Sequence, residues 1–246
     1  MKILITGASS GLGAELARQY ASSENELILL ARREEKLQQL QKELQSLCKD
    51  IKLIIADVTQ FKDLQEKLRV IESLDMVILN AGISLGHSYS QTPTIEEFKN
   101  LYDVNVLANH AILEVLLPIF TAQKSGKIAF ISSLASLFSM PSSKVYSSSK
   151  RALNAYAEGL RYKYTPYGIK VINILPGFIK SELTDKNEFK MPFLLETKEG
   201  VRLIKSAIEK EKAFYPFPRR FYLFIRLLSL LPNFFVQKVV NRFSDR

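Results

Sequence analysis

The chain begins with an apolar segment, a glycine-rich turn and a helix-forming segment in direct succession. Residues 2–5 predict a buried strand, and residues 14–20 have the composition of a helix. Between them, Gly7, Gly11 and Gly13 allow a tight turn and a close approach to a pyrophosphate, whose charge is met by N–H groups and the helix dipole. Their spacing differs from the commonest dinucleotide fingerprint, G-x-G-x-x-G. The segment predicts a dinucleotide site, and a loop that only turns the chain is the alternative.

Apolar segments with the length of strands alternate with helical patterns through much of the chain. Strands are predicted over residues 26–30, 53–58, 75–82 and 127–132, and leucines from Leu37 to Leu47 recur at the spacing of one helix face. Strands that alternate with helices indicate a parallel sheet. A chain of 246 residues without an internal repeat is long enough for one such domain. We therefore expect a single α/β domain with a doubly wound parallel sheet, the Rossmann fold.

The end of the second predicted strand bears on the choice of cofactor. An NAD-specific site normally places Asp or Glu there to bind the adenosine ribose hydroxyls. This chain has Ala31-Arg32-Arg33 instead. An Arg side chain can bind a 2′-phosphate through a bidentate contact, and no carboxylate is there to repel the phosphate. We therefore expect NADP(H) to be preferred over NAD(H), unless both arginines are solvated residues that pair with Glu34 and Glu35.

Polar and small residues also follow the third and fourth predicted strands. Ligands of open α/β sheets gather at the carboxyl ends of the strands. Asp57 is placed to bond the adenine amino group, and Asn80-Ala81-Gly82 lets the chain pass close to the adenosine ribose. Each of these residues could alternatively be a turn or cap residue.

A second group of residues can supply proton chemistry. Tyr146 and Lys150 are four residues apart and share one face if the segment is helical. A neighbouring ammonium favours the phenolate and lowers the tyrosine pKa toward neutral pH. Ser133 follows the strand predicted at 127–132, and its hydroxyl could hold a carbonyl oxygen.

Together these motifs resemble the short-chain dehydrogenase/reductase family in order and spacing, over residues 2 to about 181. The resemblance rests on Thr6-Gly7-Ala8-Ser9-Ser10-Gly11-Leu12-Gly13, Asp57, Asn80-Ala81-Gly82, Asn105, Ser133, Tyr146 with Lys150, and Pro176-Gly177. It implies an NADP(H)-dependent oxidoreductase that reduces a ketone or aldehyde to an alcohol by hydride transfer. It also implies a homodimer or homotetramer.

The resemblance implies a role for each catalytic residue. Tyr146 is the proton donor in reduction and the base in oxidation, and Ser133 orients the carbonyl. Lys150 lowers the tyrosine pKa and binds the nicotinamide ribose, while Asn105 positions a water in the proton relay. The implied cofactor-binding residues are Gly7, Ser9, Ser10, Gly11, Leu12, Gly13, Arg32, Arg33, Asp57, Val58, Asn80, Ala81, Gly82, Tyr146, Lys150, Pro176, Gly177 and Ile179. No Cys/His cluster suggests a metal.

Two parts of the chain depart from the family pattern or extend it. Ser136 and Ser139 stand where the family often has glycine, and with Phe138 and Met140 we expect them to give a trimmed, more apolar substrate pocket. The predicted catalytic domain covers residues 1–213 and includes an apolar substrate lid at about 181–197. This lid indicates an apolar or lipid-like substrate, or it is simply a lid that packs on the domain.

Residues 214–246 form a predicted C-terminal extension that is both basic and apolar. From residue 202 onward ten Lys or Arg stand against three acidic residues, which gives +7 of the net charge of +9. The apolar run at 221–236 is too short and too broken to span a bilayer. An amphipathic helix on an anionic membrane surface and a helix pair packed on the domain or on a second subunit both fit. Nucleic acid does not fit, because no binding motif accompanies the charges.

These patterns lead to an NADP(H)-dependent carbonyl reductase. A nonenzymatic NADP(H)-binding or membrane-associated regulatory protein on the same fold is the alternative, although binding alone needs no proton donor. We expect a cytoplasmic protein, with peripheral attachment to a membrane as a variant, because a strand rather than a signal peptide is predicted from residue 2.

Overall fold

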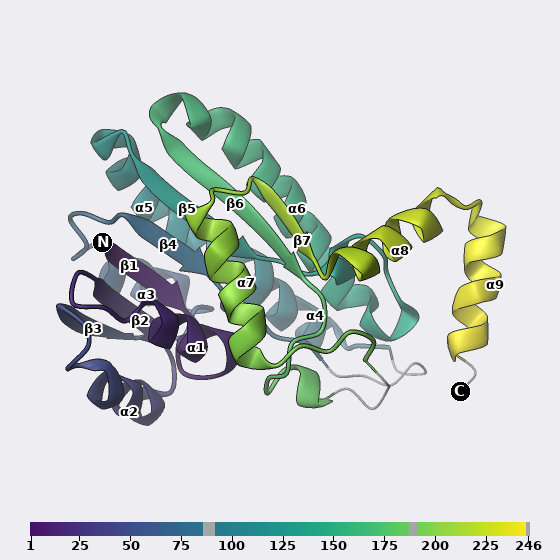
Figure 1. The fold of residues 1–246 in the computed structure, drawn as a ribbon, viewed down its shortest axis with the longest axis horizontal. Coiled ribbons are helices and arrows are strands. Elements are labelled where there is room, and N and C mark those ends of the chain that lie inside the picture. The colour runs from purple at the N-terminus through teal and green to yellow at the C-terminus, as the bar shows by residue number, and fades with distance from the viewer. Residues whose placement is uncertain (86–91, 187–190, 245–246) are drawn as a thin grey trace.

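The fold is built on a seven-stranded sheet in which all neighbouring strands are parallel (Figure 1). The computed structural model describes residues 1–85, 92–186 and 191–244. The strands are β1 (Lys2–Thr6), β2 (Glu26–Ala31), β3 (Asp50–Ile55), β4 (Met76–Leu79), β5 (Gly126–Ile131), β6 (Ile169–Pro176) and β7 (Phe214–Phe217). The longer helices are α1 (Gly11–Tyr20), α2 (Glu34–Leu44), α3 (Phe61–Leu68), α4 (Ile95–Tyr102), α5 (Ala108–Gln123), α6 (Lys144–Tyr164), α7 (Thr197–Glu209), α8 (Arg219–Leu230) and α9 (Asn233–Ser244). This confirms the predicted doubly wound domain.

The strand order places a binding crevice near the middle of the sheet. The order is β3-β2-β1-β4-β5-β6-β7, so the chain runs outward from β1 to β3 and then returns to the other side of β1. At this reversal the connections after β1 and β4 leave toward opposite faces. In open α/β sheets such a switch point is where ligands bind, at the carboxyl ends of the strands.

Two apolar layers cover the sheet, one on each face. Ile3 and Ile5 of β1 belong to the layer with α1, α2 and α7, while Leu4 belongs to the layer with α3, α5 and α6. All three side chains are fully buried. Because successive side chains of a strand point to opposite faces, burial on both sides requires the uninterrupted apolar runs seen in the sequence.

The structure shifts two of the predicted elements. Helix α2 ends at Leu44, so Leu47 lies beyond it and is 52% exposed. The N–H groups of Leu47 and Cys48 both bond to the Leu44 carbonyl, and this tight turn moves Leu47 away from the buried face. The third strand lies at Asp50–Ile55 rather than 53–58, because its pairing with β2 runs from Asp50 to Ile55.

A continuous helix from Ile95 to Gln123 crosses from α4 to α5 through a π-helical turn, η1 (Asp103–Leu107). By length and composition alone this helix could cross a membrane, but half of its most apolar window is buried. Ile112, Leu116 and Phe120 of α5 pack in the layer beneath the sheet. It is therefore a core helix of the domain.

The C-terminal region divides into a strand and two projecting helices. Residues 214–217 of the predicted extension form β7 and complete the sheet. Helix α8 packs inward through Ile225, together with Phe221 and Tyr222. The chain is extended at Leu231, and α9 lies beyond it at one end of the molecule, away from the sheet (Figure 1).

Candidate active site

The turn between β1 and α1 has a backbone that only glycine accommodates easily. Gly7 and Gly11 have φ angles of +66° and +52°, in the left-handed region. A Cβ atom at Gly7 would lie 3.0 Å from the Ala81 Cα, and one at Gly13 would lie 2.2 Å from the Gly7 carbonyl oxygen. The loop therefore lies close to the chain after β4, and α1 begins directly above β1. This glycine cradle at a helix N-terminus fits a pyrophosphate group.

Thr6, the last residue of β1, ties the glycine loop to the segment after β4. Its buried hydroxyl accepts hydrogen bonds from the N–H groups of Asn80 and Ala81, both at 3.0 Å. The Asn80 side-chain amide donates back to the Thr6 carbonyl at 3.0 Å. Sequence reasoning assigned Thr6 no role of its own, although its position at the end of β1 was a usable signal. Through Thr6, Asn80-Ala81-Gly82 is fixed beside the cradle.

Tyr146, Lys150 and Ser133 come together at the carboxyl end of β5. Tyr146 and Lys150 lie on one face of α6, with the Lys150 ammonium 5.8 Å from the centre of the Tyr146 ring. This ammonium donates to the carbonyl of Ile131, the last residue of β5, at 2.9 Å. Ser133 follows β5 after one residue, and its hydroxyl is hydrogen-bonded to the Tyr146 side chain. The predicted juxtaposition of these three residues is present.

Burial controls the protonation of this group. It raises the pKa of Tyr146 to about 12, against the opposing effect of the hydrogen bond with Ser133. It also lowers the pKa of the Lys150 ammonium to about 8. The expected fall in the Tyr146 pKa is therefore wrong for this structure, because desolvation dominates it. Tyr146 is held as the neutral phenol, which is the form that can donate a proton.

Asn105 lies next to this group, on the π-helical turn η1. Its fully buried side chain accepts a hydrogen bond from the Ile83 N–H at 2.8 Å and donates to the Ile83 carbonyl at 3.0 Å and the Ser149 hydroxyl at 3.1 Å. A Cβ atom at Gly82 would be 3.3 Å from the Asn105 side-chain oxygen and 3.4 Å from the Lys150 nitrogen. Asn105 and Lys150 thus lie beside the segment after β4, and Tyr146 and Ser133 adjoin Lys150. π-Helical turns occur frequently at functional sites.

A buried polar network supports the loop that carries Ser133. Ser132 donates to the Asn154 side chain at 2.6 Å, and Asn154 donates to the Ser136 hydroxyl, also at 2.6 Å. Ser136 in turn donates to the Ser133 carbonyl. Ser136, expected to reshape the substrate pocket, is 1% exposed and instead anchors this loop to α6. Sequence reasoning missed Asn154, because isolated Ser and Asn residues give no recognisable pattern.

Phe138, which was expected to make the substrate pocket more apolar, is partly buried. With Leu137 it packs against the small apolar cluster of Leu134, Leu175 and Ile225, beneath α8. A pocket beside Tyr146 is lined by other residues: Ser84, Leu85, Pro93, Ser142, Ser143, Lys144 and Val145. Its lining mixes polar and apolar side chains. That Phe138 contributes to the substrate pocket stays a prediction.

The residues expected at the adenosine end are held by one another. The Asp57 carboxylate accepts hydrogen bonds from the Thr59 N–H and hydroxyl, at 2.9 and 2.8 Å, and from the Arg32 guanidinium at 3.2 Å. Burial alone would raise the pKa of Asp57, but these bonds outweigh it and lower the pKa. Val58, next to Asp57, is buried in the core. Arg32 thus pairs with Asp57 across the ends of β2 and β3, not with a neighbouring acid of α2.

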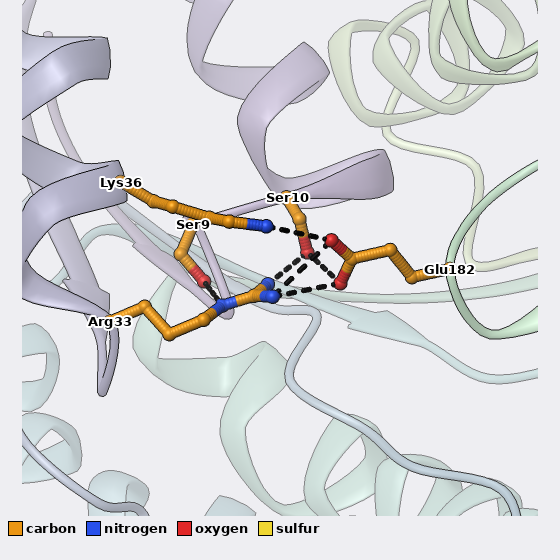
Figure 2. A network of polar contacts seen from close by, with 5 residues as sticks. All are labelled: Ser9, Ser10, Arg33, Lys36 and Glu182. Atoms are coloured by element: carbon orange, nitrogen blue, oxygen red, sulfur yellow. Dashed lines mark hydrogen bonds and ion pairs between the residues drawn. The ribbon is translucent and has the colours of Figure 1, made fainter.

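Arg33 extends to the glycine loop, where Figure 2 shows it among Ser9, Ser10, Lys36 and Glu182. Its guanidinium donates to the Ser9 hydroxyl at 3.1 Å and bonds to the Ser10 hydroxyl as well. Glu182 is bonded to Ser10, Arg33 and Lys36 in this cluster. The sequence analysis did not identify it as a site residue, because these partners are distant along the chain. The structure thus places a cationic cluster beside the cradle.

The segment after β6 reaches the same crevice. Pro176 ends β6, and the N–H of Gly177 donates to the carbonyl of Phe217 in β7 at 2.7 Å. Ile179 is 3% exposed and packs tightly on α7, where a Cβ atom at Gly200 would lie 2.6 Å from it. These contacts fix the backbone of Ile179, the predicted contact to a nicotinamide carboxamide.

Both ends of the predicted lid are attached to this segment. The N–H of Lys180 bonds to the Leu195 carbonyl, and the N–H of Leu195 bonds to the Phe178 carbonyl, each at 3.0 Å. A Cβ atom at Gly11 would be 3.4 Å from the Ser181 Cβ, so Ser181 lies over the glycine loop. Leu12 on the other side of that loop packs on the core. Residues 187–190 of the lid lie outside the described residues.

Comparison with known proteins agrees with this geometry. The short chain dehydrogenase family model matches residues 1–191. An uncharacterized oxidoreductase of Myxococcus xanthus is 35% identical over 234 residues, which cover 94% of this chain and 92% of that protein.

Two solved structures share the fold. A short-chain dehydrogenase from Sphingobium yanoikuyae in complex with NADPH has a TM-score of 0.82 and 25% identity, covering 88% of this chain and 87% of the other. The bulky-bulky ketone specific alcohol dehydrogenase from Comamonas testosteroni has a TM-score of 0.79 and 25% identity, covering 94% of each chain. Since the family model matches more than half of the chain and a full-length relative is more than 30% identical, the chain belongs to the short-chain dehydrogenase family of oxidoreductases.

Proposed function

We propose that the protein is an NADP(H)-dependent oxidoreductase that reduces a ketone or aldehyde to an alcohol. The observation that carries this proposal is the convergence of Ser133, Tyr146 and Lys150 beside Gly82, next to the glycine cradle. A proton donor, a hydroxyl to hold an oxygen and a buried ammonium are the groups that carbonyl reduction needs. A ketone-specific alcohol dehydrogenase among the similar structures supports this class of substrate.

Each side chain of the site has a separate role at the reacting carbonyl group. A bound nicotinamide cofactor would supply the hydride for the carbonyl carbon. The Ser133 hydroxyl holds the carbonyl oxygen, and the Tyr146 hydroxyl transfers its proton to that oxygen as negative charge develops there. The Lys150 ammonium stabilises the phenolate that remains, and a proton taken up from solvent past Asn105 restores the phenol.

Two observations support NADP(H) as the preferred cofactor. Arg32 and Arg33 lie at the end of β2, and Lys36 adds a third positive charge nearby. Guanidinium and ammonium groups with hydroxyls bind phosphate well. The similar structure from Sphingobium yanoikuyae holds NADPH. The arrangement favours a cofactor that carries a 2′-phosphate.

The loss of the Tyr146 hydroxyl tests the proposed reaction. In Tyr146→Phe, we expect the rate of NADPH oxidation with a responsive carbonyl compound to fall at least about a hundredfold, because the proton donor is gone. Binding of NADPH, followed by its fluorescence, should persist. Tyr162→Phe is the matched control, since Tyr162 is an exposed tyrosine of the same helix, 69% accessible. If the protein only binds NADP(H) and is not an enzyme, the rate of NADPH oxidation will not depend on the carbonyl compound. It will then be the same in the wild type, Tyr146→Phe and Tyr162→Phe.

We further propose that the substrate is apolar. We also propose that α8 and α9 bind an anionic membrane surface, so that the protein is cytoplasmic and attached peripherally to the membrane. The exposed apolar side chains of this region are Leu223, Phe224, Leu227, Leu230, Leu231, Phe234 and Phe235. Arg219, Arg220, Arg226 and Lys238 are interspersed with them. Apolar faces with basic residues favour anionic lipid. A second copy of the chain on this face, in a homodimer or homotetramer, is the competing proposal.

A further inference from the structure

A carboxylate from the segment after β6 occupies the cationic cluster beside the glycine loop (Figure 2). Glu182 accepts hydrogen bonds from the Ser10 hydroxyl at 2.9 Å, from the Arg33 guanidinium at 3.0 Å and from the Lys36 ammonium at 2.9 Å. The Arg33 guanidinium also donates to the Ser9 hydroxyl at 3.1 Å. Three donor side chains, from the glycine loop and from the start of α2, thus converge on one anionic group, and Ser9 lies beside them as a partner of Arg33.

The donors around Glu182 have the chemistry of a phosphate site. One guanidinium, one ammonium and two hydroxyls can all donate to phosphate oxygens. Arg33 and Lys36 supply two positive charges, and Glu182 neutralises one of them. A phosphate monoester, with a charge between −1.5 and −2 at neutral pH, would match the two cations more closely.

The carboxylate can be displaced at small cost. The side chains of Arg33, Lys36 and Glu182 are 43%, 46% and 53% exposed, so solvent screens their ion pairs. Exposed ion pairs contribute little to stability. Lys36, together with Ser10 and Arg33, lowers the pKa of Glu182 to about 2. Glu182 is therefore an anion at neutral pH, and another anionic group would compete with it for these donors.

We propose that Glu182 is an internal competitor that occupies the site for the 2′-phosphate of NADP(H) and must leave when this phosphate binds. The inference rests on the proposed NADP(H) dependence. Ser181, the residue before Glu182, lies over Gly11, so the exchange takes place at the edge of the pyrophosphate cradle. Glu182 thereby sets the affinity for phosphorylated cofactors and leaves the recognition of adenosine unchanged.

A pair of nucleotides that differ only by the phosphate in question tests the proposal. We would titrate 2′,5′-ADP and 5′-AMP into the wild-type protein and Glu182→Gln, and measure the two dissociation constants by calorimetry. Removing the competing charge should tighten binding of 2′,5′-ADP about fivefold or more, and change that of 5′-AMP by less than about twofold. The gain should shrink at high salt, because the competing pairs are exposed.

Glu35→Gln is the matched control. Glu35 is an exposed residue of α2, next to Lys36, and lies outside the network of Figure 2. This variant changes the net charge by the same amount, so it should leave both affinities within about twofold of the wild type if direct competition, rather than the general field, is responsible.

Each other result overturns the inference in a recognisable way. If wild-type protein binds 2′,5′-ADP and Glu182→Gln binds it equally or more weakly, Glu182 does not compete with the phosphate, while the proposed cofactor stands. An equal gain for both nucleotides, or an equal gain in Glu35→Gln, rejects a phosphate-specific role. If neither nucleotide nor NADPH binds to any of the three proteins, the proposed cofactor fails and the inference fails with it.

Discussion

Lys150 combines a positive charge with nearly complete burial, at 4% exposure. Its ammonium has a hydrogen bond to the Ile131 carbonyl, but burial still lowers its pKa from 10.5 to about 8. The folded state therefore bears a cost for keeping this group charged below pH 8. A proton donor with a pKa of about 12 stands next to it, in Tyr146. In the proposed reaction this cation lies next to the group on which negative charge develops, which would account for a buried lysine that lowers stability.

This cost predicts that Lys150→Met is more stable than the wild type at neutral pH. We expect a gain in the free energy of unfolding of roughly 2 kcal/mol at pH 7, from the lowered pKa less the lost hydrogen bond. Between pH 8 and 10.5 unfolding of the wild type takes up a proton, so the wild type gains stability with rising pH and the advantage of the variant shrinks. Urea denaturation at several pH values measures this difference.

A control and a contrary outcome accompany this prediction. Lys163→Met removes an exposed lysine of the same helix and should change stability little at any of these pH values. If Lys150→Met is less stable than the wild type even at pH 7, the hydrogen bond to Ile131 outweighs the cost of burying the charge.

The elements of the site are held by close backbone packing at the glycine loop. A Cβ atom at Gly13 would lie 2.2 Å from the Gly7 carbonyl oxygen, so α1 can approach β1 only without a side chain there. Gly159 in α6 is the opposite case, because a Cβ atom there would meet nothing within 4 Å. A side chain at Gly13 would therefore be opposed by packing, whereas one at Gly159 would affect only the helix propensity.

Gly13→Ala and Gly159→Ala should have opposite effects on stability. We expect Gly13→Ala to lower the free energy of unfolding by about 2 kcal/mol or more and to weaken NADPH binding, because α1 must move away from the loop. Gly159→Ala should raise stability by about 0.5 to 1 kcal/mol through helix propensity. Denaturation curves of both variants measure the effects. Equal effects in the two variants would mean that the contact at Gly13 relaxes without cost.

The elements that sequence alone could predict are those whose signal is local. Strand β1 can be predicted because burial on both faces requires an uninterrupted apolar run. That Tyr146 and Lys150 share one face follows from their spacing on a helix. The bounds of β3 were wrong because its pairing with β2 sets them. Glu182 was invisible because its partners Ser10 and Arg33 are 172 and 149 residues away in sequence. Their contact exists only once the sheet has formed.

The whole molecule has an uneven distribution of charge and apolar surface. From residue 202 onward the chain carries +7 of the net charge of +9, and α8 and α9 project from one end of the molecule (Figure 1). Inward packing of α8 is limited to Ile225 and its partly buried neighbours, while Leu227 and Leu230 on the same helix are 66% and 77% exposed. The exposed side of α8 can therefore be altered without disturbing the core.

Leu227→Glu combined with Leu230→Glu should abolish the proposed membrane binding. We expect wild-type protein to co-sediment with vesicles of phosphatidylglycerol and phosphatidylcholine but not with phosphatidylcholine alone, and the double variant to stay in solution. Val70→Glu, at a site 76% exposed beside α3, is the control for added charge. If the double variant co-sediments as the wild type does, the membrane proposal is wrong. A smaller oligomer in the variant would favour packing of α8 on a second copy.

The π-helical turn η1 makes this family member sensitive to small changes in chain length. It accommodates an additional residue between α4 and α5 without ending the helix that runs from Ile95 to Gln123. Deleting one residue between Leu101 and Asn105 would restore regular α-helical spacing and change the direction of the Asn105 side chain relative to α4. Asn105 could then no longer bond to the Ile83 backbone while Leu101 stays buried. Among related sequences, single-residue deletions should therefore occur in surface loops and be absent from this turn.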